Sequence, residues 1–354
     1  MAQIFKDSKP HYQLLDGLRG VAALMVVWYH VGEGFATSPI DQRFNHGYLA
    51  VDFFFILSGF VIGYAYDDRW GRMSLKEFFR RRLIRLHPMV IMGAVIGALT
   101  FCVQGCVRWD GTSVGLSSLL LALFLGMFLL PACPGAGCEV RGNGEMFPLN
   151  GPAWSLFFEY IGNIFYALVL HRLPTRWLAA VVGISGGGLL AFGVFNLRML
   201  FSYSMGMLMA RNFKPLRIRG SFWIGTILLG VFLAVPHVDD MEHLWMNGLY
   251  DSFCILVVFP CIVYMSASEQ KNDRHTVRIS QFLGDISYPL YMVHYPFMYL
   301  FYAWVWDNHV PYVQALPVAF GVIIVSIAVA YLCMRFYDLP LRRWLATYFQ
   351  KPGG

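Results

Sequence analysis

The sequence predicts an all-α membrane protein that crosses the bilayer about ten times. Of its 354 residues, 57% are hydrophobic and 14% are charged, whereas soluble proteins carry about 25% charged residues. The hydrophobic residues form long continuous runs rather than the stripes of soluble helices. Arginines and lysines gather between these runs, where they orient helices in a membrane. We therefore predict no nucleic-acid partner from the net charge of +6.

Eleven runs have, or approach, the length of a membrane span. The first, 14–35, contains Arg19 and His30 and lacks a small-residue cleavage site, so we interpret it as a spanning helix and not a signal peptide. The loop 67–85 is strongly basic and is therefore predicted to be cytoplasmic. Two spans precede it, so the amino terminus is predicted to be cytoplasmic too. The candidate spans are 14–35, 48–66, 86–104, 114–131, 152–171, 177–196, 198–211, 221–236, 248–266, 283–303 and 313–336.

One of these runs does not fit the alternation of sides. Counting from the two ends of the chain places the loop 132–150 on opposite sides of the membrane, because several later loops are also basic. The serine- and glycine-rich run 114–131 is therefore predicted to lie at the outer interface or to re-enter. Ten spans then remain, both termini are cytoplasmic, and residues 1–354 form one membrane domain.

The cysteines show no pattern of a metal site, since there is no CxxC motif and no zinc-type spacing with histidine. We predict no metal. Cys133 and Cys138 flank a loop rich in proline and glycine, where they form a short disulfide if the loop faces an oxidising side, or lie near each other only by coincidence. The glycine-rich run 183–188 lies in a hydrophobic segment without a preceding strand, which favours close helix packing over nucleotide binding.

Two ionisable residues share one face of the first span. His30 follows Arg19 by eleven residues, about three helical turns and roughly 16 Å of rise. Ionisable groups at membrane depth are costly and often functional. We predict that His30 is catalytic, with packing between helices as the alternative.

Two carboxylates also occupy hydrophobic runs. Asp52 enters the second span from the outer side, where it either orients or charge-balances His30 or stabilises a helix start. Glu159 follows Trp154 in the fifth predicted run, and its burial is costly unless it is paired. We predict that Asp52 and Glu159 assist catalysis, with a purely structural role as the alternative for each.

An arginine cluster precedes the third span. Arg80, Arg81, Arg82 and Arg85 lie where this span leaves the cytoplasm. The guanidinium group binds phosphate oxygens through two hydrogen bonds, so four arginines without a lysine favour a phosphate-rich cytosolic ligand. The alternative is the general excess of arginine in cytoplasmic loops.

Five segments together resemble the acyltransferase family 3 membrane proteins and cover nearly the whole chain in the family's order. They are LDGLRGVAALMVVWYH (15–30), VDFFFILSGFVIG (51–63), FFRRRLIRLHP (78–88), PAWSLFFEY (152–160) and ISYPLYMVHYP (286–296). The resemblance implies transfer of an acyl group, usually acetyl, from acyl-CoA to sugar hydroxyls. It also implies ten spans with the donor side in the cytosol, and the short tail resembles the members without a fused esterase-like domain.

The resemblance implies roles for particular residues. Arg19 and His30 match the family's essential arginine and histidine, and Arg82 and Arg85 match its R-x-x-R donor-side pair. Glu159 matches the acid of its W-S-L-x-x-E element. We predict that acyl-CoA binds Arg19, Arg81, Arg82 and Arg85, and that Trp154, Tyr291 and His294, the last two in a Y-x-x-H element, bind substrate or are structural.

The predicted function is an integral membrane O-acyltransferase of a bacterial inner membrane, with acyl-CoA as co-substrate. A hydroxyl of a cell-envelope saccharide or glycolipid accepts the acyl group, and His30 acts as base or acyl carrier. A proton-coupled transporter is the leading alternative, because intramembrane His, Asp and Glu also carry protons. Against a transporter, the sequence lacks the paired halves typical of that class, and a proton relay does not require the arginine cluster. Acylation of a small natural product is the third possibility.

Overall fold

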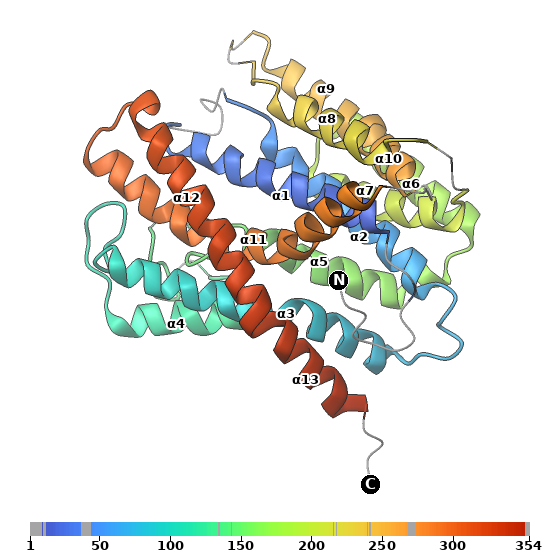
Figure 1. The fold of residues 1–354 in the computed structure, drawn as a ribbon, viewed down its shortest axis with the longest axis horizontal. Coiled ribbons are helices and arrows are strands. Elements are labelled where there is room, and N and C mark those ends of the chain that lie inside the picture. The colour runs from blue at the N-terminus through green and yellow to red at the C-terminus, as the bar shows by residue number, and fades with distance from the viewer. Residues whose placement is uncertain are drawn as a thin grey trace. The chain divides into compact units, whose positions relative to one another are not determined.

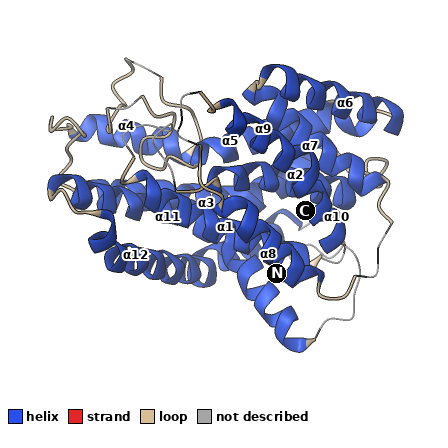
Figure 2. Ribbon diagram, turned by 90° about the horizontal axis from the view of Figure 1, so that it is seen from above, coloured by secondary structure: helices blue, strands red, loops and turns tan. Residues whose placement is uncertain are grey.

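The hydrophobic runs fold into helices, because inside a bilayer every backbone N–H and C=O must be paired within the chain. The computed structural model describes residues 9, 12–36, 44–133, 135–142, 144–214, 216, 218–238, 240, 242–267 and 273–350. Within these residues there are helices and loops and no β-strand (Figure 2). The prediction of an all-α polytopic membrane protein is confirmed.

Seven helical segments of the described residues are long and apolar enough to cross a membrane. The run 114–131 folds into α4 (Leu116–Met127), whose 12 residues rise about 18 Å, well short of a hydrocarbon core of about 30 Å. It is too short to span as a straight helix, and its predicted interfacial or re-entrant position stays a prediction. The seven segments are Gln13–Glu33, Gly47–Tyr66, Leu75–Val103, Ala153–Arg172, Thr175–Phe192, Trp245–Ser266 and Tyr312–Phe349.

Three predicted spans lie outside these seven segments. The runs 198–211 and 221–236 fall in α7 (Phe195–Arg211) and α8 (Ser221–Ala234), which have 17 and 14 residues. The run 283–303 falls in α11 (Arg274–Asp307), where tyrosines, two prolines and two histidines lower the hydropathy. The count of ten spans stays a prediction. So do the cytoplasmic termini, because both chain ends lie outside the described residues.

Contacts divide the chain into two compact units whose segments alternate along the sequence. The chain passes between the units within α1 (Gln13–Glu33), α3 (Leu75–Val103), α5 (Ala153–Leu168) and α11, and once more after Phe35. The predicted single membrane domain stays a prediction. Unit 1 comprises Met1–Gly32, Ala36–Phe78 and Glu159–Ser287, and unit 2 comprises Glu33–Phe35, Phe79–Phe158 and Tyr288–Gly354.

Unit 1 is built around helices that touch through their backbones. A Cβ atom on Gly59 of α2 would lie 1.9 Å from the carbonyl oxygen of Tyr203, and one on Gly206 of α7 would lie 1.9 Å from that of Ile56. Both positions therefore require glycine, as is common where membrane helices cross. The elements within this unit are η1 (Gly47–Leu49), α2 (Ala50–Tyr66), η2 (Leu170–Arg172), α6 (Thr175–Phe192), α7, α8, α9 (Trp245–Phe253), η3 (Cys254–Val258) and α10 (Phe259–Ser266), and α1 (Gln13–Glu33) also belongs to it up to Gly32.

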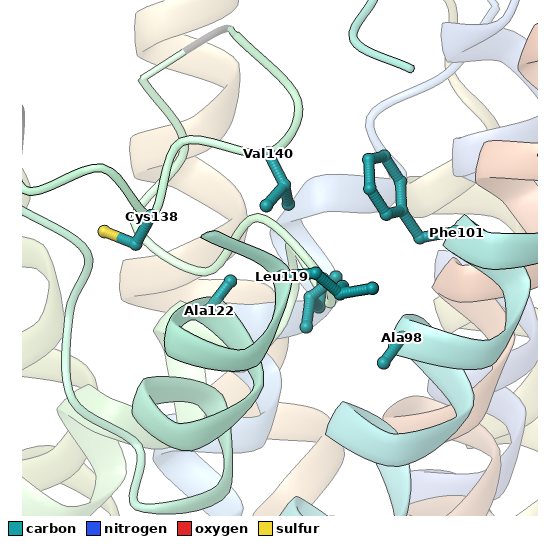
Figure 3. Close-up of a cluster of buried hydrophobic side chains, with 7 residues drawn as sticks. Ala98, Phe101, Leu119, Ala122, Cys138 and Val140 are labelled. Atoms are coloured by element: carbon teal, nitrogen blue, oxygen red, sulfur yellow. The ribbon is translucent and has the colours of Figure 1, made fainter. Parts of the chain in front are cut away.

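Unit 2 contains α4, most of α3, and the continuous run of α12 (Tyr312–Cys333), η4 (Met334–Asp338) and α13 (Leu339–Gln350). Figure 1 shows α3 and α4 side by side. A buried apolar cluster joins these two helices to the loop 132–150 (Figure 3). Cys138 is buried in this cluster and Cys133 is exposed, and both are free thiols. The cluster consists of Ala98, Phe101, Leu119, Ala122, Cys138, Val140 and Leu149.

Candidate active site

Arg19 and His30 lie on one uninterrupted helix, α1. Their separation of eleven residues places them on the same face, about 16 Å apart along the axis. His30 is half-buried near the carboxyl end of α1, and its ring lies edge-on to that of Tyr29 at 5.1 Å between centroids. The predicted base is therefore carried by a continuous helix and is partly exposed.

The guanidinium group of Arg19 is used to join α1 to α11. Its Nε donates to Ser287 Oγ at 2.8 Å and its Nη2 to the carbonyl of Gly284 at 3.1 Å. The two helices are in backbone contact here, because a Cβ atom on Gly20 would lie 2.3 Å from the carbonyl oxygen of Leu283. Arg19 thus positions the helix that carries His30, and its predicted contact with acyl-CoA stays a prediction.

Asp52 is 3% exposed and is bound by Arg198 of α7. The Nε of Arg198 donates to Asp52 Oδ1 at 2.7 Å, and its Nη2 donates to Asp52 Oδ2. The Nη1 of the same arginine lies 3.3 Å from Asp251 Oδ2, and Tyr48 donates to Asp251 Oδ1 at 2.7 Å. A buried polar network therefore ties α2, α7 and α9 together through one cation.

Glu159 accepts a hydrogen bond of 2.8 Å from Ser58 Oγ. This bond connects α5 to the middle of α2, and Glu159 is half-buried. This hydrogen bond offsets part of the free-energy cost of burying the carboxylate. Its predicted part in catalysis stays a prediction.

The predicted donor arginines lie on α3 in unit 2. Arg82 is 4% exposed, whereas Arg81 and Arg85 are half-buried and one turn apart, on the same face. Arg81 and Arg85 are thus the more accessible of the three. Arg80 is directed elsewhere, since its Nη1 donates to the carbonyl of Phe349 in α13 at 3.1 Å.

The W-S-L and Y-x-x-H elements meet inside unit 2. The hydroxyl groups of Ser155 and Tyr291 lie 2.6 Å apart, and the ring of Trp154 is 6.2 Å from that of Phe158. His294 is fully buried, and its Nδ1 lies 3.0 Å from the carbonyl of Leu290. Because a carbonyl only accepts, Nδ1 of His294 carries the hydrogen.

A family model described as an acyltransferase domain matches residues 12–335. The chain belongs to acyltransferase family 3. Two of the described helices that carry its motifs, α1 and α3, hold the predicted base and the predicted donor arginines respectively. The enzyme is an acyltransferase that transfers groups other than aminoacyl groups.

The chain is also similar to bacterial proteins, and two of the three described here are named as acyltransferases. A Rhizobium radiobacter protein, "Protein 2 in picA locus", is 34% identical over 183 residues, which are 49% of this chain and 89% of that protein. A "Putative O-acetyltransferase" of Staphylococcus aureus (strain MRSA252) is 25% identical over 380 residues, covering 94% of this chain and 59% of its own length. The acyltransferase MdmB of Streptomyces mycarofaciens is 30% identical over 184 residues, 47% of this chain and 42% of its own. No solved structure matches.

The residues predicted for the site of this acyltransferase belong to two units. The structure brings Arg19 to α11, Asp52 to Arg198 and Glu159 to Ser58, all within unit 1. The predicted site residues of unit 1 are Arg19, His30, Asp52 and Glu159, and those of unit 2 are Arg81, Arg82, Arg85, Trp154, Tyr291 and His294.

Arg198 is a residue of this network that the sequence analysis did not single out. It lies near the start of α7, inside the predicted span 198–211. An arginine in a hydrophobic run is itself a signal for a buried partner. Its partner Asp52 is 146 residues away, so no local pattern connects the two.

Proposed function

We propose that the protein transfers an acyl group, acetyl in the simplest case, from cytosolic acyl-CoA to a hydroxyl of a cell-envelope saccharide or glycoconjugate. The multi-pass membrane helices and the family assignment support this function. The cytoplasmic membrane of a bacterium is the proposed location, and the named relatives are bacterial proteins.

The continuous helix α1 is the observation that carries the proposal. It holds a half-buried imidazole, His30, at one end and a clamped arginine, Arg19, three turns away. Histidine is the side chain that most often acts as a general acid or base in enzymes. A continuous helix holds the imidazole in a defined position relative to Arg19.

In the proposed reaction His30 removes the proton of the acceptor hydroxyl as its oxygen attacks the thioester carbonyl of acyl-CoA. The C–S bond then breaks and the proton passes from His30 to the leaving thiolate, so the products are an O-acyl ester and free CoA. A transient acyl-histidine uses the same residues, with the imidazole nitrogen as the first nucleophile. Asp52 and Glu159 are proposed to stabilise the charge that develops on His30.

The donor phosphates are proposed to bind the arginines of α3. Arg81 and Arg85 project from one face of that helix and keep part of their surface open. Each guanidinium is able to bind a phosphate through two parallel hydrogen bonds. Arg85 also belongs to the R-x-x-R pair that the family resemblance implies, so it is the informative arginine to change.

The test compares release of CoA from acetyl-CoA by purified wild-type protein, His30→Ala and Arg85→Ala in lipid nanodiscs. Acetyl-CoA binding is measured separately by calorimetry. We expect His30→Ala to bind acetyl-CoA and release no CoA, and Arg85→Ala to bind acetyl-CoA about tenfold more weakly or worse, as loss of a charge-assisted hydrogen bond implies.

Two exposed residues provide matched controls. His275→Ala removes an exposed histidine at the start of α11, and Arg72→Ala removes an exposed arginine just before α3. Both controls are expected to behave as wild type. If the wild-type protein neither binds acetyl-CoA nor releases CoA when a crude envelope glycan is supplied, the proposed function is wrong.

A further inference from the structure

Unit 2 contains a second group of carboxylates that the proposed chemistry does not use. Tyr299 donates a hydrogen bond of 2.6 Å to Glu145 Oε2, and Tyr302 donates one of 3.2 Å to Glu33 Oε2. Tyr295 lies 3.4 Å from the same oxygen of Glu33. The three tyrosines are spaced four and three residues apart, so one face of α11 presents their hydroxyls to both acids. We call these five residues the acid–tyrosine cluster.

A buried arginine lies beside this cluster. Arg141 is 1% exposed, and its guanidinium carbon lies 3.9 Å from the ring centre of Tyr299. The rings of Phe101 and Trp109 lie at 4.8 and 5.0 Å. Its Nη1 donates to Gln104 Oε1, but its Nη2 is buried and finds no hydrogen-bond acceptor among the described residues. Cation–π contacts of Arg141, a residue of the loop 132–150, with Tyr299 therefore connect this part of the loop to α11.

The cluster is also reachable. Glu33, Glu145 and Trp109 are half-buried, and Trp306 is 41% exposed. Among the described residues only Oε2 of Glu145 receives a hydrogen bond, so Oε1 is available to a ligand. The rings of Trp109 and Trp306 lie 4.9 Å apart, edge to face. Oε1 of Glu145 therefore lies beside Tyr299, whose ring is 5.9 Å from that of Trp109.

We propose that the acid–tyrosine cluster, with Trp109 and Trp306, binds the acceptor as a neutral saccharide. Hydroxyls of the sugar donate to Glu145 and Glu33, and an apolar face of the ring packs on a tryptophan, a combination of a few placed polar groups with aromatic lining that suits such a ligand. Two acidic side chains beside one guanidinium leave no net positive charge for the phosphates of CoA, so an uncharged ligand fits this place better. The inference rests on the proposed function, because it names the second substrate.

The position along the chain agrees with this role. Glu33 is the last residue of α1, three residues after His30. The loop 132–150, which carries Glu145, is predicted to face the outside of the membrane. An acceptor that approaches from outside would therefore meet this cluster at the end of the helix that carries the proposed base.

The direct test is chemical protection of the wild-type protein. A water-soluble carbodiimide with a glycine amide nucleophile labels accessible carboxyl groups, and peptide mass spectrometry measures the rate at Glu145 and at Glu139. Chitotriose and maltotriose are the neutral probes, and trigalacturonate is the anionic one. We expect a neutral probe to slow labelling of Glu145 at least threefold and to leave Glu139, in the same loop, unchanged. This experiment needs no catalytic turnover.

The kinetic test compares Glu145→Gln with the matched control Glu139→Gln, which makes the same chemical change in the same loop. We expect Glu145→Gln to raise KM for the saccharide that slows labelling of Glu145 about tenfold, relative to KM for acetyl-CoA. This is the loss expected for one strong hydrogen bond. The proposal is overturned if neither neutral probe protects Glu145, if only trigalacturonate does, or if the ratio of the two KM values is unchanged. Absence of all acetyl-CoA turnover would instead overturn the proposed function.

Discussion

Breaking the ion pair between Asp52 and Arg198 is expected to destabilise the protein strongly. Asp52 is 3% exposed and accepts two hydrogen bonds from Arg198. Removing one partner of a buried pair costs about 3–5 kcal/mol, because the other charge stays buried. Arg198 keeps a contact of 3.3 Å with Asp251, so we expect about 3 kcal/mol for Asp52→Asn. At roughly 2 °C per kcal/mol for a chain of this size, the melting temperature falls by about 6 °C.

The assay is thermal unfolding in nanodiscs, followed by tryptophan fluorescence, for Asp52→Asn, Arg198→Gln and the double variant. In the double variant neither Asp52 nor Arg198 leaves the other charge unpaired, and Asp251 loses its cation to the same extent as in Arg198→Gln alone. The double variant should therefore lose clearly less than the sum of the two single variants. Asp110→Asn, in an exposed loop, is the control for removal of a carboxylate. Additive losses, or a change below 1 °C for Asp52→Asn, would refute the reasoning.

The same variants separate a structural role of Asp52 from its predicted role at His30. If Asp52 acts only through Arg198, the two single variants lose similar activity at temperatures where both are folded. If Asp52 also stabilises the charged form of His30, Asp52→Asn has the lower kcat of the two. A kcat for Arg198→Gln below that of Asp52→Asn contradicts both alternatives.

Three further outcomes are expected. Gly20→Ala forces a methyl group to 2.3 Å from a carbonyl of α11 and should lower the melting temperature by several degrees, whereas Gly183→Ala, with open space at its Cβ, should not. Asn150→Ala strands a buried carbonyl of α11 and should cost about 1–3 kcal/mol by the same assay, while Asn308→Ala removes the same kind of bond at the surface and should cost little. Burial raises the pKa of Glu145 from its usual 4.5 to about 7; the folded state then binds this proton more tightly, so stability should fall as pH rises from 4.5 to 7, and Glu145→Gln should flatten that fall.

The sequence predicted what depends on local pattern. Hydrophobic length predicted the membrane helices, and a spacing of eleven residues correctly placed Arg19 and His30 on one helix. Loop charges indicated that 114–131 does not span, and it folds into a helix of 12 residues. These results follow from period and composition within single segments, which are the information that a sequence presents directly.

The partners of polar residues could not be predicted, because periodicity identifies the face of a helix and not the helix that it meets. Asn150 is an example, because it binds a backbone carbonyl on a distant helix. A proline cannot donate to the carbonyl four residues before it, so Pro296 leaves the carbonyl of Met292 without its helical partner. The side-chain amide of Asn150 donates to that carbonyl at 2.9 Å. The proline is visible in the sequence, but the asparagine 142 residues away is not.

Much of the polar chemistry predicted for catalysis also holds helices together. Arg19 joins α1 to α11, Asp52 joins α2 to α7 through Arg198, and Glu159 joins α5 to α2. In a bilayer such groups have no water to compensate them, so each one needs a partner before it is able to assist a reaction. Loss of activity on changing any of these residues is therefore ambiguous until stability is measured beside it. Variants that keep the melting temperature and lose only turnover, as we expect for His30, identify the reacting groups.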